Sequence, residues 1–237
     1  MPLIRLDKYI SDCGLAPRRE IKRLVKTGRI TINGVTARLP EEKLDTDTAI
    51  VTFDGKTVEY RKYRYFMLNK PAGVLSAVND GRQKTVLDLF PPEYKKLGLF
   101  PVGRLDKDTT GLLLVTNDGE FAHKVISPRY EIHKLYLAHT EKPVDSIDVE
   151  AFREGIILAD GTECLPAELV PLEDGACLVD VMEGKYHQVK RMLASRGKPV
   201  TELKRLRIGE LELDESLKPG QFKELGSDEL CRVMNVK

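Results

Sequence analysis

An aspartate in a short charged loop is the first candidate for chemistry in this chain. Asp106 lies in the segment GRLDKDTTGLLL, where charges alternate in sign just before an apolar run at residues 112–115. The run is too short for a helix and ends at Asn-Asp-Gly, so it predicts a buried strand. A carboxylate on a loop anchored to a core strand is well held for catalysis. The pattern alone also fits a solvent-exposed charged turn, and Asp106 with Asp108 is weak evidence for a hydrolase dyad or a metal site.

Two later segments carry polar side chains that could join this loop. Residues 130–140 alternate and predict a strand in which Lys134 and Tyr136 share one face. Residues 186–195 predict a helix that carries Lys190. Taken singly, Tyr136 fits a half-buried strand tyrosine and Lys190 fits a surface lysine, so neither identifies a site alone.

Basic residues are concentrated in two parts of a 237-residue chain whose net charge is only +1. Residues 1–38 carry nine basic and three acidic side chains, and residues 185–207 carry eight basic and one acidic. Residues 39–60, by contrast, are acidic. Two local basic patches on a nearly neutral protein indicate contact with a polyanion.

The elements that would carry the first patch are short. Residues 5–13 and 18–26 predict two helices, each with an apolar face, and residues 30–35 predict a strand that runs into an Asn-Gly hairpin turn. The second helix bears five basic residues in nine positions. These charges could simply solvate a helix face, which is their commoner role.

This arrangement resembles the S4 RNA-binding domain over about residues 5–52. The resemblance implies RNA contact by the basic helix, an RNA-binding domain at residues 1–60 and a catalytic domain at 61–237, joined by a polar linker at 56–64. The expected RNA contacts of the first domain are Arg5, Lys8, Arg18, Arg19, Lys22, Arg23 and Lys26.

The remaining motifs resemble RNA pseudouridine synthases of the small-subunit ribosomal RNA type, the RsuA-like group. The segments that show this resemblance are GRLDKDTTGLLL, the Lys-Leu-Tyr at 134–136 and EGKYHQVKRM at 183–192. The resemblance implies that Asp106 is the catalytic aspartate and that Lys190 is its cationic partner, with Arg191 as the open alternative. It also implies that Tyr136 faces the uracil.

By the same resemblance, Arg104 fills the gap that an extruded base leaves in the RNA helix. The RNA contacts expected in this second domain are Lys134, His187, Gln188 and Arg191.

The implied reaction needs little besides a nucleophile and a site for the flipped base. Conversion of uridine to pseudouridine breaks the bond from C1′ to N1, turns the uracil and joins C5 to C1′. No atom is gained and no redox change occurs, so no cofactor and no metal are expected. An ionised Asp106 is a suitable nucleophile, and a nearby cation favours its anionic form. Attack at C1′, attack at C6 and a glycal route all remain open.

The order of elements predicts an α+β protein, with a small S4-like domain and a synthase domain built on a mixed, largely antiparallel sheet. A helix with Ile126 facing inward is expected after Asp118. A turn is expected at residues 69–73. Further strands are expected at residues 156–159, 167–171, 177–182 and 205–213.

The expected partner is 16S ribosomal RNA or a small-subunit assembly intermediate, with no membrane association, and the chain is expected to be a monomer. The sequence lacks a membrane-spanning apolar run, and its four cysteines are scattered, so a cytoplasmic chain with reduced thiols is expected. The alternatives are a synthase for 23S ribosomal RNA and a catalytically silent S4-type RNA-binding or ribosome-assembly protein. Asp106, Tyr136 and Lys190 argue against the silent alternative, since such a module does not need them.

Overall fold

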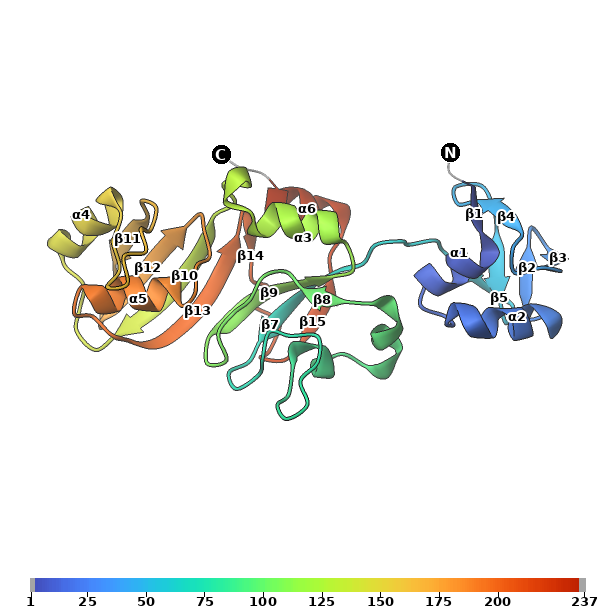
Figure 1. The fold of residues 1–237 in the computed structure, drawn as a ribbon, viewed down its shortest axis with the longest axis horizontal. Helices are drawn as coiled ribbons and strands as arrows, with labels where there is room; N and C mark the ends of the chain where they lie inside the picture. Colours follow the sequence, from blue (N-terminus) through green and yellow to red (C-terminus); the bar gives the residue numbers. More distant parts are fainter. Residues whose placement is uncertain (1–2, 235–237) are drawn as a thin grey trace. The chain divides into compact units, whose positions relative to one another are not determined.

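The computed structural model describes residues 3–234, and the chain divides into two compact units. The first unit comprises Met1–Arg64 together with Phe90–Leu99, and the second comprises Tyr65–Leu89 together with Phe100–Lys237. Figure 1 traces the elements of each unit along the chain. No pattern in the sequence indicated that Phe90–Leu99 would belong with the first unit.

The first unit contains the two expected helices over a small sheet. Leu6, Tyr9 and Ile21 are almost fully buried and form its core with strand residues such as Ile30. The Asn33-Gly34 turn has positive φ at both residues, as a tight hairpin requires. Its elements are β1 (Leu3–Arg5), α1 (Leu6–Asp12), α2 (Arg18–Lys26), β2 (Ile30–Ile32), β3 (Val35–Thr36), β4 (Lys43–Asp45), β5 (Val51–Phe53), β6 (Lys56–Val58) and the 3-10 helix η2 (Pro92–Leu97).

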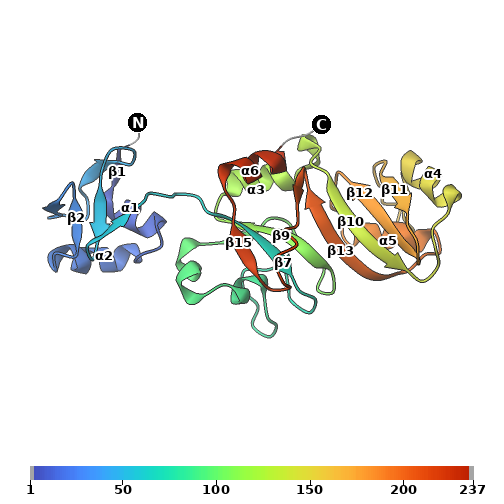
Figure 2. The same ribbon diagram turned by 180° about the vertical axis from the view of Figure 1, so that it is seen from behind.

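The second unit is built on a nine-stranded sheet with the order β11-β12-β10-β13-β9-β7-β15, to which β14 and β8 add at its sides. Every pairing is antiparallel except that of β13 with β9, so the prediction of a mixed, largely antiparallel sheet is confirmed (Figures 1 and 2). The strands are β7 (Tyr65–Lys70), β8 (Phe100–Pro101), β9 (Thr110–Thr116), β10 (Lys134–Thr140), β11 (Glu168–Pro171), β12 (Ala176–Val181), β13 (Val200–Ile208), β14 (Leu211–Glu212) and β15 (Phe222–Glu224).

The parallel pairing joins the two halves of this sheet through only two residue pairs, Lys204 with Thr110 and Arg205 with Gly111. Gly111 has φ +97°, and a Cβ atom there would lie 2.2 Å from the carbonyl oxygen of Arg205. Glycine is therefore required where the halves meet, because any side chain would push β13 away from β9.

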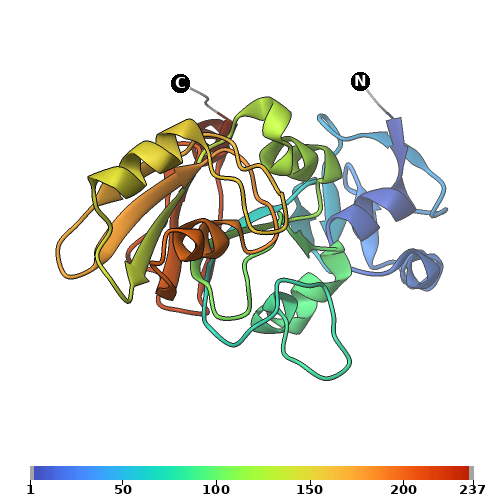
Figure 3. The same ribbon diagram turned by 60° about the vertical axis from the view of Figure 1, so that its left-hand side comes forward.

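Helices cover the two halves separately. Helices α4 (Ser146–Glu154) and α5 (Gln188–Ser195) pack Phe152 and Met192 against one face of the β10–β12 region (Figure 3). Helices α3 (Gly119–Ile126) and α6 (Ser227–Met234) contribute Val125 and Val233 to a second core. Asp118 caps α3 as predicted, since its side chain accepts from the amides of Glu120 and Phe121.

Several local predictions were wrong. Residues 156–159 form no strand, and only Ile157 makes an isolated bridge, with Glu163. Ile126 is 47% exposed instead of inward. The turn expected from residue 69 begins later because β7 continues through Lys70, and β6 occupies the start of the expected linker.

The 3-10 helices η1 (Val86–Leu89) and η3 (Pro128–Tyr130) complete the elements of the second unit. Among residues 3–234, no helix has the length and apolar character needed to cross a membrane.

Candidate active site

The loop that carries Asp106 is fixed by a buried lysine beneath it. Lys70 is fully buried, and its ammonium donates to the backbone carbonyls of Pro71, Lys107 and Thr109 at 3.1, 3.1 and 2.8 Å. Burial lowers the pKa of Lys70 to about 8, while the carboxylates of Asp108 and Asp106 act in the opposite sense. One cation thus binds two carbonyls of the aspartate loop, those of Lys107 and Thr109, and ties them to the Pro71 carbonyl next to its own residue.

A serine fixes the other end of the same loop. The Ser76 hydroxyl donates to the carbonyl oxygen of Leu105 at 2.8 Å and accepts from the Leu105 amide at 3.0 Å. Leu105 is buried, so the residue before Asp106 cannot rotate freely. The carboxylate is therefore presented from a backbone with little freedom, as a catalytic group requires.

Two groups from the segment around α5 approach Asp106. His187 Nε2 lies 3.3 Å from Oδ1 of Asp106, and Lys190 Nζ lies 3.7 Å from Oδ2. Lys190 also binds Asp108 Oδ1 at 2.6 Å, and this hydrogen bond holds the pKa of Asp108 below its usual value. His187 has φ +51° immediately before α5, which explains why the helix begins at Gln188, later than expected.

Arg191 points elsewhere. Its Nη2 lies 2.6 Å from Oδ2 of Asp160, and its Nη1 donates to the carbonyl of Tyr186. Of the two cations left open by the sequence, Lys190 is the one beside Asp106.

Tyr136, Arg104 and Asp106 line one small cavity of about 60 Å³. Tyr136 is half-buried on β10, and its hydroxyl accepts from Nη1 of the buried Arg205 at 3.3 Å. Arg104 is exposed at the rim. The cavity is completed by Leu105, Thr109, Val181, Glu183, Gly184, Lys185, His187, Gln188, Val189 and Leu203.

Two expected RNA contacts of this unit are wrong. Lys134 is 6% exposed, its ammonium donates to the Met182 carbonyl, and burial lowers its pKa to about 8. Gln188 is 5% exposed, donates to Glu183 and accepts from the Lys185 amide. Both side chains serve the internal packing of the unit, whereas His187 and Arg191 remain partly exposed.

The basic residues expected to contact RNA in the first unit fall into two groups. Arg5 and Arg18 both bind the buried Asp7, so part of their function is internal. The other five of this expected set are exposed and form no ion pair within residues 3–234; they are Lys8, Arg19, Lys22, Arg23 and Lys26.

The sequence did not indicate Lys70, Ser76 or Arg205 as parts of this site. Lys70 lies in an Asn-Lys-Pro-Ala-Gly segment that predicts an ordinary exposed turn, and Arg205 lies among many basic residues. Only an isolated charge within an apolar run would have signalled burial, and neither residue shows that pattern.

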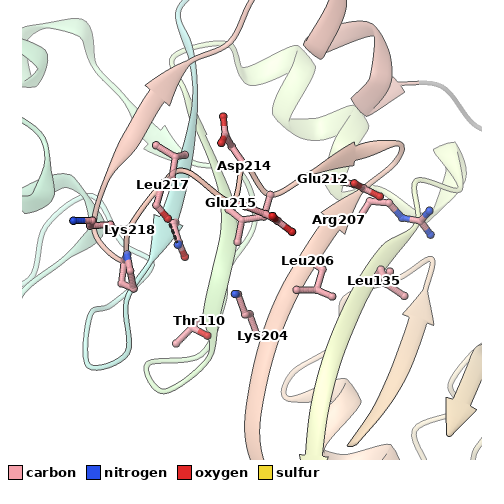
Figure 4. Close-up of a pocket in the computed structure, with 13 residues that line it drawn as sticks. Thr110, Leu135, Lys204, Leu206, Arg207, Glu212, Asp214, Glu215, Leu217 and Lys218 are labelled. Atoms are coloured by element: carbon pink, nitrogen blue, oxygen red, sulfur yellow. Dashed lines mark hydrogen bonds between the residues drawn. The ribbon is translucent and has the colours of Figure 1, made fainter. Parts of the chain in front are cut away.

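Figure 4 shows a larger cavity, of about 710 Å³, and none of its lining residues lines the small cavity at Asp106. Leu135, Leu206 and Lys204 line one side of it, and Asp214 with Glu215 line the other. Because side chains alternate along a strand, Leu135 lies on the sheet face opposite to its neighbour Tyr136. Cavity size alone would therefore identify the wrong face of the sheet.

Comparison with known proteins identifies the family. Residues 64–195 match the model of the RNA pseudouridylate synthase family, and residues 4–50 match the S4 domain. The chain therefore belongs to the RNA pseudouridine synthases, isomerases that act on uridine in RNA, and it carries an S4 domain.

Named relatives extend over nearly the whole chain. An uncharacterised RNA pseudouridine synthase of Bacillus subtilis is 42% identical over 96% of this chain and 97% of its own. Ribosomal small subunit pseudouridine synthase A of Vibrio cholerae is 38% identical over 97% of this chain and 99% of its own. A pseudouridylate synthase crystal structure is similar with a TM-score of 0.69, at 33% identity, over 97% of this chain and 99% of that one.

Proposed function

We propose that this protein converts a specific uridine of 16S ribosomal RNA to pseudouridine, with Asp106 as the nucleophile and without a cofactor. The observation that carries the proposal is the approach of Lys190 and His187 to within 4 Å of Asp106, at a cavity that Tyr136 also lines. These two side chains can orient the carboxylate, and a carboxylate is a suitable nucleophile for covalent catalysis.

Each remaining residue of the cavity has a role in this scheme. Tyr136 offers a flat face to the extruded uracil, and Arg104, exposed at the rim, enters the gap left in the RNA helix. Extruding a base costs a few kcal/mol. Phosphate contacts by the basic face of α2 offset that cost, so the first unit acts as an RNA-binding domain that includes residues 1–60.

The choice of small-subunit RNA rests on the relatives. Proteins named ribosomal small subunit pseudouridine synthase A match this chain at 38% identity in Vibrio cholerae and 39% in Yersinia pestis, in both cases over most of its length. We propose that the protein works as a cytoplasmic monomer and that it acts on 16S RNA or on a small-subunit assembly intermediate.

One experiment tests this function. Purified protein is incubated with unmodified 16S and 23S transcripts, and pseudouridine is mapped by carbodiimide-blocked primer extension. One new stop in the 16S transcript is expected, and none in 23S. Stops found only in the 23S transcript would show that the protein modifies large-subunit RNA. The absence of stops in both transcripts and in assembly intermediates would support the silent RNA-binding alternative.

A further inference from the structure

Arg205 is a buried cation next to the candidate active site. It is 5% exposed on β13, its Nε donates to the Leu112 carbonyl at 2.8 Å, and its Nη1 donates to the Tyr136 hydroxyl at 3.3 Å. The guanidinium carbon lies 5.9 Å from the centre of the Tyr136 ring. The side chain thus joins the middle of β9 to the tyrosine that lines the cavity.

The position is costly for a guanidinium. No carboxylate within residues 3–234 pairs with Arg205, and its Nη2 is buried with no hydrogen-bond partner. A buried charge without a counter-ion strongly destabilises a fold, and an apolar residue would hold β9 against β13 at lower cost. The two polar contacts that Arg205 does make therefore require a reason beyond packing.

The hydrogen-bonding capacity of arginine supplies that reason. A guanidinium only donates, so the Tyr136 oxygen must accept the bond from Nη1. The phenolic proton is then directed to another acceptor, and Tyr136 lines the cavity beside Asp106. Without Arg205 the hydroxyl could rotate and donate into the protein instead.

We propose that Arg205 is a positioning residue that fixes the Tyr136 hydroxyl as a hydrogen-bond donor toward bound uridine. It touches neither the RNA nor Asp106, and it acts through Tyr136. Leu112 anchors it, because the carbonyl in the centre of β9 holds Nε and so orients the plane of the guanidinium. The inference rests on the proposed role of Tyr136 in catalysis.

A double-mutant cycle tests this dependence, because residues acting through one another are non-additive. Turnover is measured by tritium release from 5-tritiated uridine in whichever ribosomal RNA the wild type modifies. Arg205→Met and Tyr136→Phe are each expected to lower kcat at least tenfold, with KM changed less than threefold. The double variant is expected to match Tyr136→Phe within threefold, and Arg205→Lys is expected to recover part of the activity. If the two losses multiply, Arg205 does not act through Tyr136.

Arg207→Met is the matched control. Arg207 lies two residues further along β13 and pairs with Asp180 at 2.9 Å, away from Tyr136. The kcat of Arg207→Met is expected to stay within threefold of that of the wild type. Should Arg205→Met fail to fold, the same cycle is run with Arg205→Lys, and multiplying losses there would also overturn the proposal.

A spectroscopic measurement separates this inference from the proposed function. Tyrosine labelled with ¹³C at Cζ is incorporated, and the Tyr136 resonance is assigned by its loss in Tyr136→Phe. Its chemical shift is expected to change in Arg205→Met and to stay unchanged in Arg207→Met. An unchanged shift in Arg205→Met would reject the proposed bond. If the wild-type protein forms no pseudouridine, the proposed function is rejected, but the chemical-shift measurement still tests the bond between Arg205 and Tyr136.

Discussion

The ammonium of Lys190 lies 2.6 Å from Asp108 but 3.7 Å from Asp106. One cation is therefore shared between two carboxylates, and the one proposed as the nucleophile is the more distant. The Asp108 side chain is 75% exposed, whereas that of Asp106 is 25% exposed. Solvent weakens the pair with Asp108, so we infer that this contact mainly orients Lys190 beside Asp106.

Asp106→Asn is expected to abolish turnover while leaving the fold and RNA affinity nearly unchanged. The amide keeps the shape of the side chain but is not a nucleophile. Tritium release from 5-tritiated uridine should fall at least a thousandfold, and circular dichroism and filter binding should match wild type. Asp108→Asn is the control and should retain activity within about tenfold. Asp106 has another role if its variant retains more than a tenth of wild-type activity.

Lys190→Met is expected to lower kcat at least tenfold, because it removes the cation nearest to Asp106. Arg191→Met should stay within threefold, since Arg191 pairs with Asp160. Single-turnover kinetics on the mapped RNA substrate distinguish the two variants. A larger loss of kcat in Arg191→Met than in Lys190→Met would show that Arg191 pairs with Asp106 when RNA is bound.

Lys70→Met is expected to destabilise the second unit. Each of the three carbonyls left without a donor costs about 1–3 kcal/mol, whereas relief of the buried charge returns about 3 kcal/mol for a pKa lowered to about 8. At about 2 kcal/mol per carbonyl, the net loss at pH 7.5 should be about 3 kcal/mol. Urea unfolding followed by circular dichroism measures it, with the exposed Lys107→Met as control.

The same pair of proteins tests the pH dependence. An unfolded lysine has a pKa of about 10.4, so between pH 8 and 10.4 the unfolded state binds more protons than the folded state. The free energy of unfolding of the wild type should therefore rise with pH relative to Lys70→Met, by about 2 kcal/mol between pH 7.5 and 9.5. A constant difference would show that the pKa of Lys70 is not lowered.

Changing Arg19, Lys22 and Arg23 together to Gln is expected to weaken RNA binding and flatten its salt dependence. Each neutralised phosphate contributes roughly 0.7–0.9 to the slope of log K against log salt, so the slope should fall by about 2. The apolar face of α2 is untouched, so the fold should persist in circular dichroism. An unchanged slope would mean that this face does not meet the RNA.

Gly111→Ala is expected to disrupt the second unit, with a loss of more than about 3 kcal/mol. The new Cβ would lie 2.2 Å from the Arg205 carbonyl, at a backbone φ of +97° that alanine rarely adopts. Gly81→Ala is the control, because that glycine has open space around it and no positive φ. Thermal unfolding should be unchanged in the control, and an equally stable Gly111→Ala would show that β9 and β13 tolerate separation.

Local patterns in the sequence determined much of this protein. The apolar spacing of residues 18–26 predicted helix α2 with its observed bounds, and Asp118 predicted the start of α3. The apolar run at residues 112–115 predicted strand β9 and the loop that precedes it. These features depend on residues only a few positions apart in the sequence, so periodicity and helix capping suffice to predict them.

The contacts that build the candidate site were decided by the tertiary structure. Lys190 meets Asp108 across 82 positions, Lys70 meets Thr109 across 39, and Arg205 meets Tyr136 across 69. Alternation along a strand shows which residues share a face, but it does not show which face a helix covers. For that reason the sequence did not reveal that Lys134 and Gln188, which were predicted to contact RNA, are buried. Burial of a charged or polar side chain depends on distant segments that supply its partners, and only the folded chain brings those partners together.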